Sequence, residues 1–452
     1  MTKNHSIENA LEKYAGLCQK NDEFSPVLFK QYGVKRGLRD VDGSGVLTGL
    51  TNISKVEGSQ YINGKKVPCE GSLWYRGYSI FDLVSGLRGK RNAFEETAYL
   101  LMLGELPKKD ELDQFCALLG SLSVLPRNFV RDVIMKAPTV DLMNSMTRSV
   151  LTLASYDDTI GNQDLDVQLL QCLKLVAVMP MLAVYGYHAY NYSKNHGSMY
   201  VHRPRKNLSV AENILAMLRP DQSYTPLEVE VLDIALLLHM EHGGGNNSTF
   251  TTRVITSSGS DTYSTMAAAL CSLKGPKHGG ANIKVMSMMA DIKKHLGKRY
   301  TEGELADYLT KILEGEAFDR KGLIYGMGHA IYSINDPRAT VFKRFVEELA
   351  SSKGREQEYQ LYSTIERLAP EIISDKRDIY KGVSANVDFY SGFVYEMLGI
   401  PVQLFTPMFA IARIVGWSAH RIEELVTGDK IIRPAYLSIM KEKEFISRDE
   451  RG

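Results

Sequence analysis

The chain has 452 residues, of which 44% are hydrophobic and 24% are charged, and its formal net charge is +1. This length suffices for two domains, or for one large domain with a smaller one attached. A nearly neutral chain lacks the basic excess that a broad nucleic-acid footprint requires. The five cysteines form no CxxC pair and no zinc-ligand spacing, so we expect reduced thiols, no metal site and a cytoplasmic protein.

The N-terminal region carries the strand patterns. Its first residues lack the apolar core of a secretory signal, and acidic residues come too early for a typical transit peptide. Residues 46–53 are rich in threonine and branched side chains, which predicts a strand. Farther on, the pair Asn63-Gly64 separates two short β-prone runs and therefore predicts a hairpin turn.

Helical patterns dominate the rest of the chain. Several predicted helices are apolar nearly all round, so we expect them to be fully buried in a large helical core. The most apolar stretch, residues 175–187, is shorter than the roughly 20 residues of a membrane span and contains Pro180, so we predict a buried helix. The other predicted helices are residues 94–103, 140–154, 208–218, 227–239, 263–273, 283–296, 341–350, 390–398 and 407–425. The predicted fold class is all-α with a small N-terminal β-hairpin region.

A first candidate site residue, His278, lies in the sequence Gly-Pro-Lys-His-Gly-Gly-Ala-Asn. A helix is predicted to begin about here, and the positive end of a helix dipole favours a neutral imidazole, which can donate a hydrogen bond without being charged. The alternative is a histidine in a tight turn. Glycines on both sides favour a functional role, because they let a ligand approach the backbone.

A second cluster begins with His329, which ends a Gly-Met-Gly-His sequence. Asp336 followed by Pro337 predicts a helix start, with the aspartate as N-cap and the proline in the first position. Arg338 then falls in the first turn, where a positive charge is unfavourable for the helix. An anion held by Arg338 and the free helix amides would explain this placement, and a solvated arginine is the alternative.

A third cluster is Asn-Val-Asp388-Phe-Tyr-Ser-Gly, at the start of another predicted helix. Taken alone, Asp388 is predicted to be the N-cap of that helix. Its aromatic neighbours would also desolvate the carboxylate, and a partly desolvated carboxylate is a better base than a solvated one.

Two more histidines and two arginines are of interest. His239 and His242 lie three positions apart and share a helix face, but without a third ligand they favour a polar pocket lining over a metal site. Arg413 lies in an apolar stretch and should be at least partly buried, so it needs an anionic partner, either a structural carboxylate or a bound one. Arg433, just before Pro434, is by itself a surface residue.

Taken together, these clusters resemble the citrate synthase family over most of the chain. Each motif alone is weak, whereas all of them in this order are highly specific. The matching motifs are Gly37-Leu38-Arg39, Thr48-Gly49-Leu50-Thr51, Phe94-Glu95-Glu96, His239-Met240-Glu241-His242, the three clusters around His278, His329 to Arg338 and Asp388, and finally Ala412-Arg413 with Gly416-Trp417.

The resemblance implies an all-α homodimer whose large and small domains close over the substrates. Glycine-rich clusters at both edges of the segment from about 275 to 388 are typical of the hinges of a small domain. We therefore expect a large domain formed by residues 1–276 and 389–452, and a small domain formed by residues 277–388.

The resemblance also implies a role for each candidate residue in condensing acetyl-CoA with oxaloacetate. Asp388 would remove a methyl proton from acetyl-CoA, His278 would stabilise the resulting enol, and His329 would polarise the ketone and protonate the new alkoxide. The citryl thioester would then be hydrolysed, with acetyl-CoA as a substrate and no further cofactor. Oxaloacetate would be held by His242, Arg338, Arg413 and, from the neighbouring subunit, Arg433.

The sequence departs from the family at one place. Many relatives carry a basic residue shortly after the histidine that matches His329, whereas residues 330–334 here are Ala-Ile-Tyr-Ser-Ile. We hypothesise that Arg39 or the basic run at 202–206 contacts the phosphates of CoA instead. The expected CoA-binding residues are thus Arg39, Gly326, Met327 and Gly328.

Two alternatives remain at this level. A 2-methylcitrate synthase uses propionyl-CoA on the same fold, and one methylene group in a pocket is worth only about 1–3 kcal/mol. A non-catalytic helical dimer that binds a ligand would keep the fold without the chemistry. The intact set of His278, His329 and Asp388 argues against this second alternative.

Overall fold

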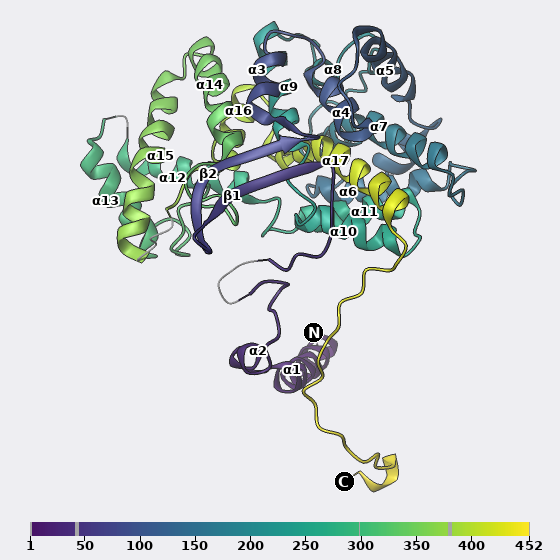
Figure 1. Cartoon of the computed structure of the whole chain (residues 1–452), viewed down its shortest axis with the longest axis vertical. Helices are drawn as coiled ribbons and strands as arrows, with labels where there is room; N and C mark the ends of the chain where they lie inside the picture. Colours follow the sequence, from purple (N-terminus) through teal and green to yellow (C-terminus); the bar gives the residue numbers. More distant parts are fainter. Residues whose placement is uncertain (1, 41–44, 298, 378–381, 452) are drawn as a thin grey trace. The chain divides into compact units, whose positions relative to one another are not determined.

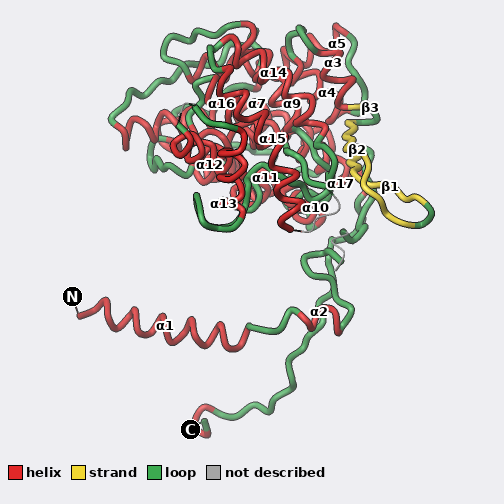
Figure 2. The backbone as a smooth tube through the Cα atoms, turned by 90° about the vertical axis from the view of Figure 1, so that its left-hand side faces the viewer, coloured by secondary structure: helices red, strands yellow, loops and turns green. Residues whose placement is uncertain are grey.

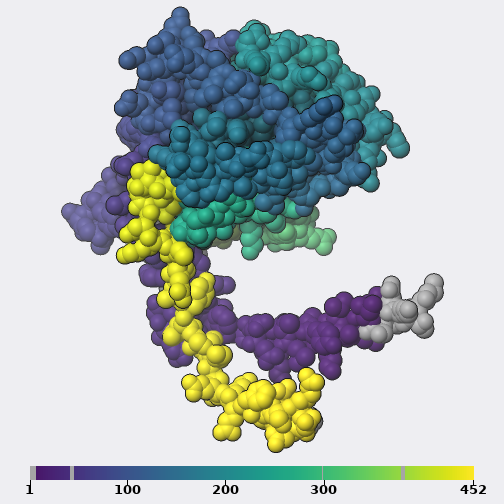
Figure 3. All heavy atoms as spheres, turned by 90° about the vertical axis from the view of Figure 1, so that its right-hand side faces the viewer, coloured from purple at the N-terminus to yellow at the C-terminus, as the bar shows by residue number. Residues whose placement is uncertain are grey.

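The computed structural model describes residues 2–40, 45–297, 299–377 and 382–451. The chain divides into two compact units, one formed by Met1–Leu50 with Arg433–Gly452 and the other by Thr51–Ile432. The first unit contains α1 (Thr2–Asp22), α2 (Val27–Gln31) and the short 3-10 turn η3 (Arg448–Glu450). Its C-terminal segment is extended (Figure 3). The expected boundaries of a small domain at 277 and 388 stay a prediction.

The second unit is built almost entirely of helices, which confirms the predicted fold class (Figure 1). All nine helices predicted from apolar periodicity are present, with ends shifted by at most a few residues. The helices are α3 (Ile80–Leu87), α4 (Ala93–Leu103), α5 (Lys109–Leu122), α6 (Leu142–Ala154), α7 (Leu165–Asn195), α8 (Val210–Leu218), α9 (Pro226–His239), α10 (Asn247–Ser257), α11 (Thr262–Lys274), α12 (Ala281–Leu296), α13 (Glu302–Leu313), α14 (Pro337–Ser352), α15 (Glu356–Arg377), α16 (Val387–Met397) and α17 (Phe405–Thr427), with a π turn η1 (Val130–Ile134) and a 3-10 turn η2 (Val402–Leu404).

Helix α17 is central to the packing of this unit. It contacts α4, α7, α9, α10 and α11, and most of its side chains are buried. The stretch 175–187 lies within α7 and is buried, as predicted. By length and composition, α7 and the segment Val402–Thr427 are long and apolar enough to cross a membrane, but 78% and 83% of their most apolar windows lie inside the protein.

One small antiparallel sheet accompanies the helices (Figure 2). Strand β1 (Ser54–Ile62) pairs with β2 (Lys65–Tyr75) through the turn at Asn63-Gly64, so the predicted hairpin is confirmed, and β2 pairs with β3 (Tyr78–Ser79). The predicted strand at 46–53 is wrong. Among the described residues, pairing with β2 begins only at Ser54, so residues 46–53 have no partner strand in this sheet, and the side chains of Leu47 and Leu50 are more than nine-tenths exposed.

The hairpin packs closely on the loop that follows His329. A Cβ atom at Gly58 or Gly71 would lie closer than 3.0 Å to the carbonyl oxygens of Ile331 and Asn335, respectively. The amide of Gly71 also donates a 2.8 Å hydrogen bond to the side chain of Asn335. These two glycines therefore allow the sheet to support a loop that carries candidate site residues.

A glycine inside α17 gives a first prediction. A Cβ atom at Gly416 would lie closer than 3.0 Å to the carbonyl oxygen of Met240 and to Oε2 of Glu241. Although alanine favours a helix, Gly416→Ala should lower the free energy of unfolding by about 1–3 kcal/mol through overpacking. Urea unfolding measures the change. The matched control, Gly86→Ala in α3, has open space around it and should be neutral or slightly stabilising; equal effects of the two variants would contradict the packing argument.

Two buried carboxylates hold helix ends near α4. Asp233 on α9 accepts hydrogen bonds from the amides of Ala93 (2.8 Å) and Phe94 (3.0 Å), and Glu95 accepts one from Val210 (2.7 Å) at the start of α8. Burial raises the pKa of both carboxyls, and the charge of Asp233 adds to the shift of Glu95. These residues cap neighbouring helices at the cost of placing two carboxyls in an interior where ionisation of both is unfavourable.

These raised pKa values give a second prediction. A carboxyl whose pKa is higher in the folded state contributes stability below its unfolded pKa of about 4, and this contribution is lost as the pH rises through the folded pKa. In Glu95→Gln the amide oxygen still accepts from Val210. The melting temperature of the variant, relative to the unmodified protein, should therefore increase between pH 5 and pH 9. The control, Glu230→Gln, removes a less buried carboxylate that accepts a hydrogen bond from Gly89 and should show no such trend.

Candidate active site

Two chain segments that carry predicted site residues are joined by backbone hydrogen bonds. The amide of Gly328 donates to the carbonyl of Ser384 (2.7 Å), and the amide of Asn386 donates to the carbonyl of Gly326 (2.9 Å). The side chain of Asn386 also donates to the carbonyl of Gly328 (2.9 Å). This pairing places the loop that ends at His329 beside the start of α16.

His242 and His329 lie close together, as the predicted site requires. Their ring centroids are 4.9 Å apart, although one follows α9 and the other precedes α14. Tyr332 links them, since its ring stacks on His329 at 4.8 Å and its hydroxyl lies 3.2 Å from Nε2 of His242. Tyr332 is 1% exposed and is therefore a fixed part of the site wall.

Arg338 is buried and pairs with a carboxylate of its own helix start. Its Nε and Nη2 donate to the two carboxylate oxygens of Asp336 at 3.0 and 2.7 Å, and Asp336 also accepts from the amide of Arg338 as N-cap of α14. The predicted cap is thus confirmed. The alternative of a solvated arginine is wrong, because Arg338 is 4% exposed and its charge is neutralised by the bidentate contact.

Arg413 is also buried, but it contacts no carboxylate among the described residues. Its Nε donates to the carbonyl of His239 at 2.7 Å, its guanidinium lies 4.7 Å from the ring centroid of Phe409, and its Nη1 has no hydrogen-bond partner in the described part of the chain. Burial lowers the pKa of Arg413 to about 10, so it stays charged at neutral pH. A charged donor that is left unpaired in this way is suited to an anionic ligand.

His278 lies in the turn between α11 and α12, three residues before α12 begins. Its Nε2 is 3.0 Å from the hydroxyl of Ser248, and the same hydroxyl accepts a 3.1 Å hydrogen bond from the indole of Trp417. The helix begins slightly later than predicted. Its N-cap is Gly280, so His278 lies just before the helix. Sequence reasoning missed Ser248, which fixes the orientation of the histidine ring.

The three histidines are neutral at physiological pH. Burial lowers the pKa of His278 to about 4, with the charge of Arg413 as second cause. Burial and the charge of Arg338 lower the pKa of His329 to about 4, and the same causes hold the pKa of His242 well below its ordinary value. The predicted neutral form of His278 is confirmed, with desolvation as the first cause and the charge of an arginine as the second.

Asp388 is the second residue of α16, and it is not the N-cap. Asn386 is the cap, since its side chain accepts a 3.0 Å hydrogen bond from the amide of Asp388. The predicted capping role of Asp388 is therefore wrong, and its carboxylate is left available. Burial raises its pKa to about 6, against the opposing charge of Arg338, which confirms the expected desolvation. A carboxylate tuned in this way is a good general base near neutral pH.

The remaining predicted residues are placed as follows. His239 and His242 have different neighbours. The ring of His239 stacks on Phe409 at 4.5 Å, whereas the ring of His242 contacts His329. Among the described residues, no group of three or more histidine, cysteine, aspartate or glutamate residues could hold a metal ion. Arg39 and Arg433 belong to the first unit, so their roles in binding CoA and in completing a partner's site stay predictions.

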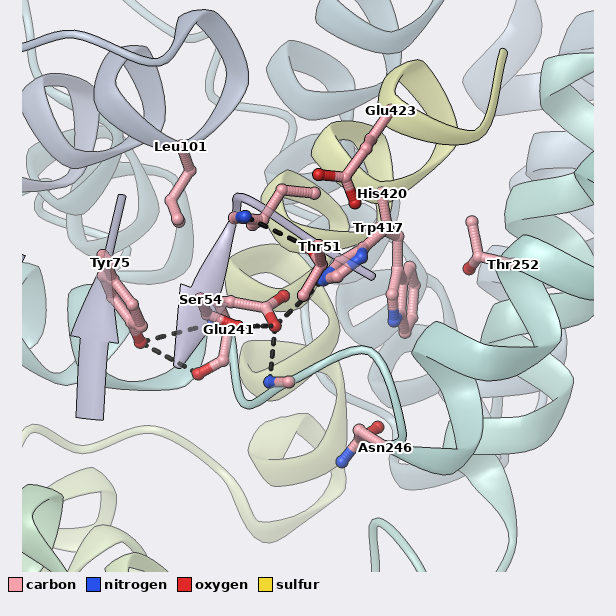
Figure 4. Close-up of polar contacts among 12 residues, drawn as sticks. Thr51, Ser54, Tyr75, Leu101, Glu241, Asn246, Thr252, Trp417, His420 and Glu423 are labelled. Atoms are coloured by element: carbon pink, nitrogen blue, oxygen red, sulfur yellow. Dashed lines mark hydrogen bonds and ion pairs between the residues drawn. The ribbon is translucent and has the colours of Figure 1, made fainter. Parts of the chain in front are cut away.

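Glu241, between these two histidines, is a further residue that sequence reasoning missed. It is fully buried, and Figure 4 shows Ser54, Tyr75 and His420 directed toward it. Ser54 (2.9 Å) and His420 (3.0 Å) lie within hydrogen-bonding distance of its Oε1, and the hydroxyl of Tyr75 donates to its carbonyl oxygen at 3.0 Å. A charged residue in an otherwise apolar stretch was the available signal, as it was for Arg413.

The arrangement brings together a raised-pKa carboxylate, neutral histidines and buried arginines. Such a set can remove a proton from carbon while hydrogen-bond donors stabilise the oxyanion that forms, beside cationic groups that hold an acidic substrate. Such a set is typical of an enzyme of acid–base catalysis.

Comparison with known proteins identifies the family. The family model described as "Citrate synthase, C-terminal domain" matches residues 40–435. The citrate synthase of Corynebacterium glutamicum is 34% identical over 423 residues, which cover 92% of this chain and 90% of that protein. The 2-methylcitrate synthase 1 of the same organism is 32% identical, with 92% and 98% of the two chains covered.

Solved structures agree with this assignment. The citrate synthase of Pyrobaculum aerophilum superposes with a TM-score of 0.74 at 30% identity, covering 92% of this chain and 95% of that one. The citrate synthase of Thermoplasma acidophilum, solved as a ternary complex with carboxymethyl coenzyme A and oxaloacetate, gives a TM-score of 0.75 at 25% identity, covering 92% and 98%. The chain belongs to the citrate synthase family, which is a family of acyltransferases.

Proposed function

We propose that this protein condenses acetyl-CoA with oxaloacetate and hydrolyses the citryl thioester to citrate and CoA. The observation that carries the proposal is that the unusually basic carboxylate of Asp388 feels the charges of Arg338 and Arg413, the same arginines that act on the paired ring of His242 beside His329. A structural neighbour was solved with oxaloacetate and a coenzyme A derivative, which supports this choice of substrates.

In the proposed reaction, Asp388 removes a proton from the methyl group of acetyl-CoA. Neutral His278, held by Ser248, donates a hydrogen bond to the thioester oxygen as the enol forms. His329 donates to the ketone of oxaloacetate and protonates the alkoxide that results from C–C bond formation. One donor of this kind typically contributes about 100- to 1000-fold in rate, because it acts on charge that develops in the transition state.

Oxaloacetate carries two carboxylates, and two buried arginines support its binding. Arg413 offers an Nη1 that is unpaired among the described residues, while Arg338 is already neutralised by Asp336 and adds donors in a fixed geometry. His242 completes the set. In this proposal Arg433 reaches the site of a second subunit in a homodimer, CoA contacts Arg39 and residues 326–328, no other cofactor takes part, and the enzyme is cytoplasmic.

A second candidate function is 2-methylcitrate synthesis from propionyl-CoA. It is favoured by the similarity to a 2-methylcitrate synthase, which is almost equal to the similarity to a citrate synthase. A pocket discriminates one methylene group by only about 10- to 200-fold, so both acyl donors are expected to react to some degree.

The test is thiol release by the purified protein with oxaloacetate, comparing acetyl-CoA and propionyl-CoA at matched concentrations. A higher kcat/KM with acetyl-CoA would support citrate synthesis, and a higher value with propionyl-CoA would assign 2-methylcitrate synthesis. Absence of release with both donors from a folded protein would refute both functions.

A further inference from the structure

Glu241 is an ionised carboxylate that the proposed reaction does not use. It lies directly before His242 at the end of α9, and its Oε1 receives hydrogen bonds from Ser54, His420 and the amide of Gly243 (Figure 4). Burial opposes its charge, but the hydrogen bond from His420 and the charge of the nearby Arg413 hold the pKa of Glu241 below its ordinary value. The carboxylate therefore carries a full negative charge inside the protein at neutral pH.

The three donors to Oε1 of Glu241 are neutral. Arg253 donates from Nε (3.1 Å) and Nη2 (2.8 Å) to Nδ1 of His420, so Nδ1 is an acceptor and the ring hydrogen lies on Nε2, facing Glu241. His420 is thus held as the neutral Nε2–H tautomer. The contacts around Glu241 fix its position without cancelling its charge.

The geometry directs this charge toward Arg413. A Cβ atom at Gly416, one turn after Arg413 on α17, would lie 2.5 Å from Oε2 of Glu241, so this oxygen faces α17. Oε2 has no hydrogen-bond partner among the described residues. Arg413 is held to the same chain segment through the carbonyl of His239. Glu241 and Arg413 therefore interact through their charges without a direct hydrogen bond, unlike the bidentate pair of Arg338 and Asp336.

We propose that Glu241 is the counter-charge of Arg413 and sets the affinity of the site for its dianionic substrate. In the empty site, the carboxylate offsets the cost of burying an unpaired guanidinium. In the occupied site, the same charge repels the carboxylates of oxaloacetate. Glu241 therefore stabilises the free enzyme and weakens the binding of the substrate. The inference rests on the proposed binding of oxaloacetate.

The test is Glu241→Gln, whose amide oxygen keeps the three hydrogen bonds while the charge is removed. Calorimetry without an acyl donor should show a dissociation constant for oxaloacetate lowered by about tenfold or more. The melting temperature of the free enzyme should fall. Glu241→Asp retains the charge but shortens the side chain, and it should destabilise the protein without tightening binding.

The matched control is Glu423→Gln, because Glu423 pairs with Arg253 in the same network but lies farther along it. This variant should leave the dissociation constant within about twofold of the original value. A folded Glu241→Gln protein with unchanged or weaker oxaloacetate binding would overturn the inference. Failure of the unmodified protein to bind oxaloacetate would instead refute the proposed function.

A second variant covers the case in which Glu241→Gln does not fold. Glu241→Met removes the same charge with a side chain of similar length, and it should also lower the dissociation constant for oxaloacetate relative to the unmodified protein. Unchanged or weaker binding by a folded Glu241→Met protein would also overturn the inference.

Discussion

Asp388→Asn should lower kcat by about 100- to 10,000-fold, because the amide cannot accept the proton that the proposed reaction removes from carbon. Binding of oxaloacetate should persist, since Asp388 is not among its expected ligands and its loss removes a negative charge near Arg338 and Arg413. Thiol release in the steady state gives kcat, and calorimetry gives the dissociation constant.

The pH dependence gives the same base a second signature. Because burial raises the pKa of Asp388 to about 6, kcat/KM for the acyl donor should increase as the pH rises through this value and level off above it. The control, Asp291→Asn, removes a carboxylate that accepts a hydrogen bond from Tyr308 on α13 and should keep both kcat and the profile. Turnover by Asp388→Asn within tenfold of the original enzyme would exclude Asp388 as the base.

The largest effect on stability is expected from Asp336→Asn. Asparagine retains a side-chain oxygen that can cap α14, but the buried guanidinium of Arg338 loses its neutralising charge. Breaking a buried ion pair by removing one partner typically costs about 3–5 kcal/mol, which is a large part of the stability of a domain. Urea unfolding should show a loss of this size.

Two further variants separate the charge from other effects. Asp336→Asn combined with Arg338→Met removes both charges and should recover much of the lost stability, because no uncompensated charge remains buried. Glu302→Gln removes one partner of an exposed pair with Arg367 and should change stability little. If Asp336→Asn were no more destabilising than Glu302→Gln, the buried pair would not stabilise the fold.

Much of the fold follows from local patterns in the sequence. Helices α4, α9 and α14 begin and end close to the predicted residues, because their apolar periodicity coincides with caps such as Asp336 and stops such as Gly104. The strand predicted at 46–53 failed because strand formation requires a partner, and residue composition alone does not supply one.

The site shows the same division between local and long-range information. His278, His329 and Asp388 stand out by their glycine-rich or aromatic surroundings, whereas the contacts of Tyr332 with His242 and of Ser248 with His278 join segments that are distant in the sequence. The isolated pattern assigned the cap of α16 to Asp388 when Asn386 performs it. The long-range partners of Tyr332 and Ser248 could not be inferred from spacing along the chain, because such contacts form only in the folded protein.

The hydrogen bonds between residues 326–328 and 384–386 have a consequence for motion. They join the segment that ends at the proposed proton donor His329 to the start of α16, which carries the proposed base Asp388, whereas His278 and Arg413 are carried by other elements. If parts of the enzyme separate to admit substrate or release product, the acid and the base travel together. Their mutual geometry is then preserved through the catalytic cycle, and only their distance to the rest of the site has to be restored at each turnover.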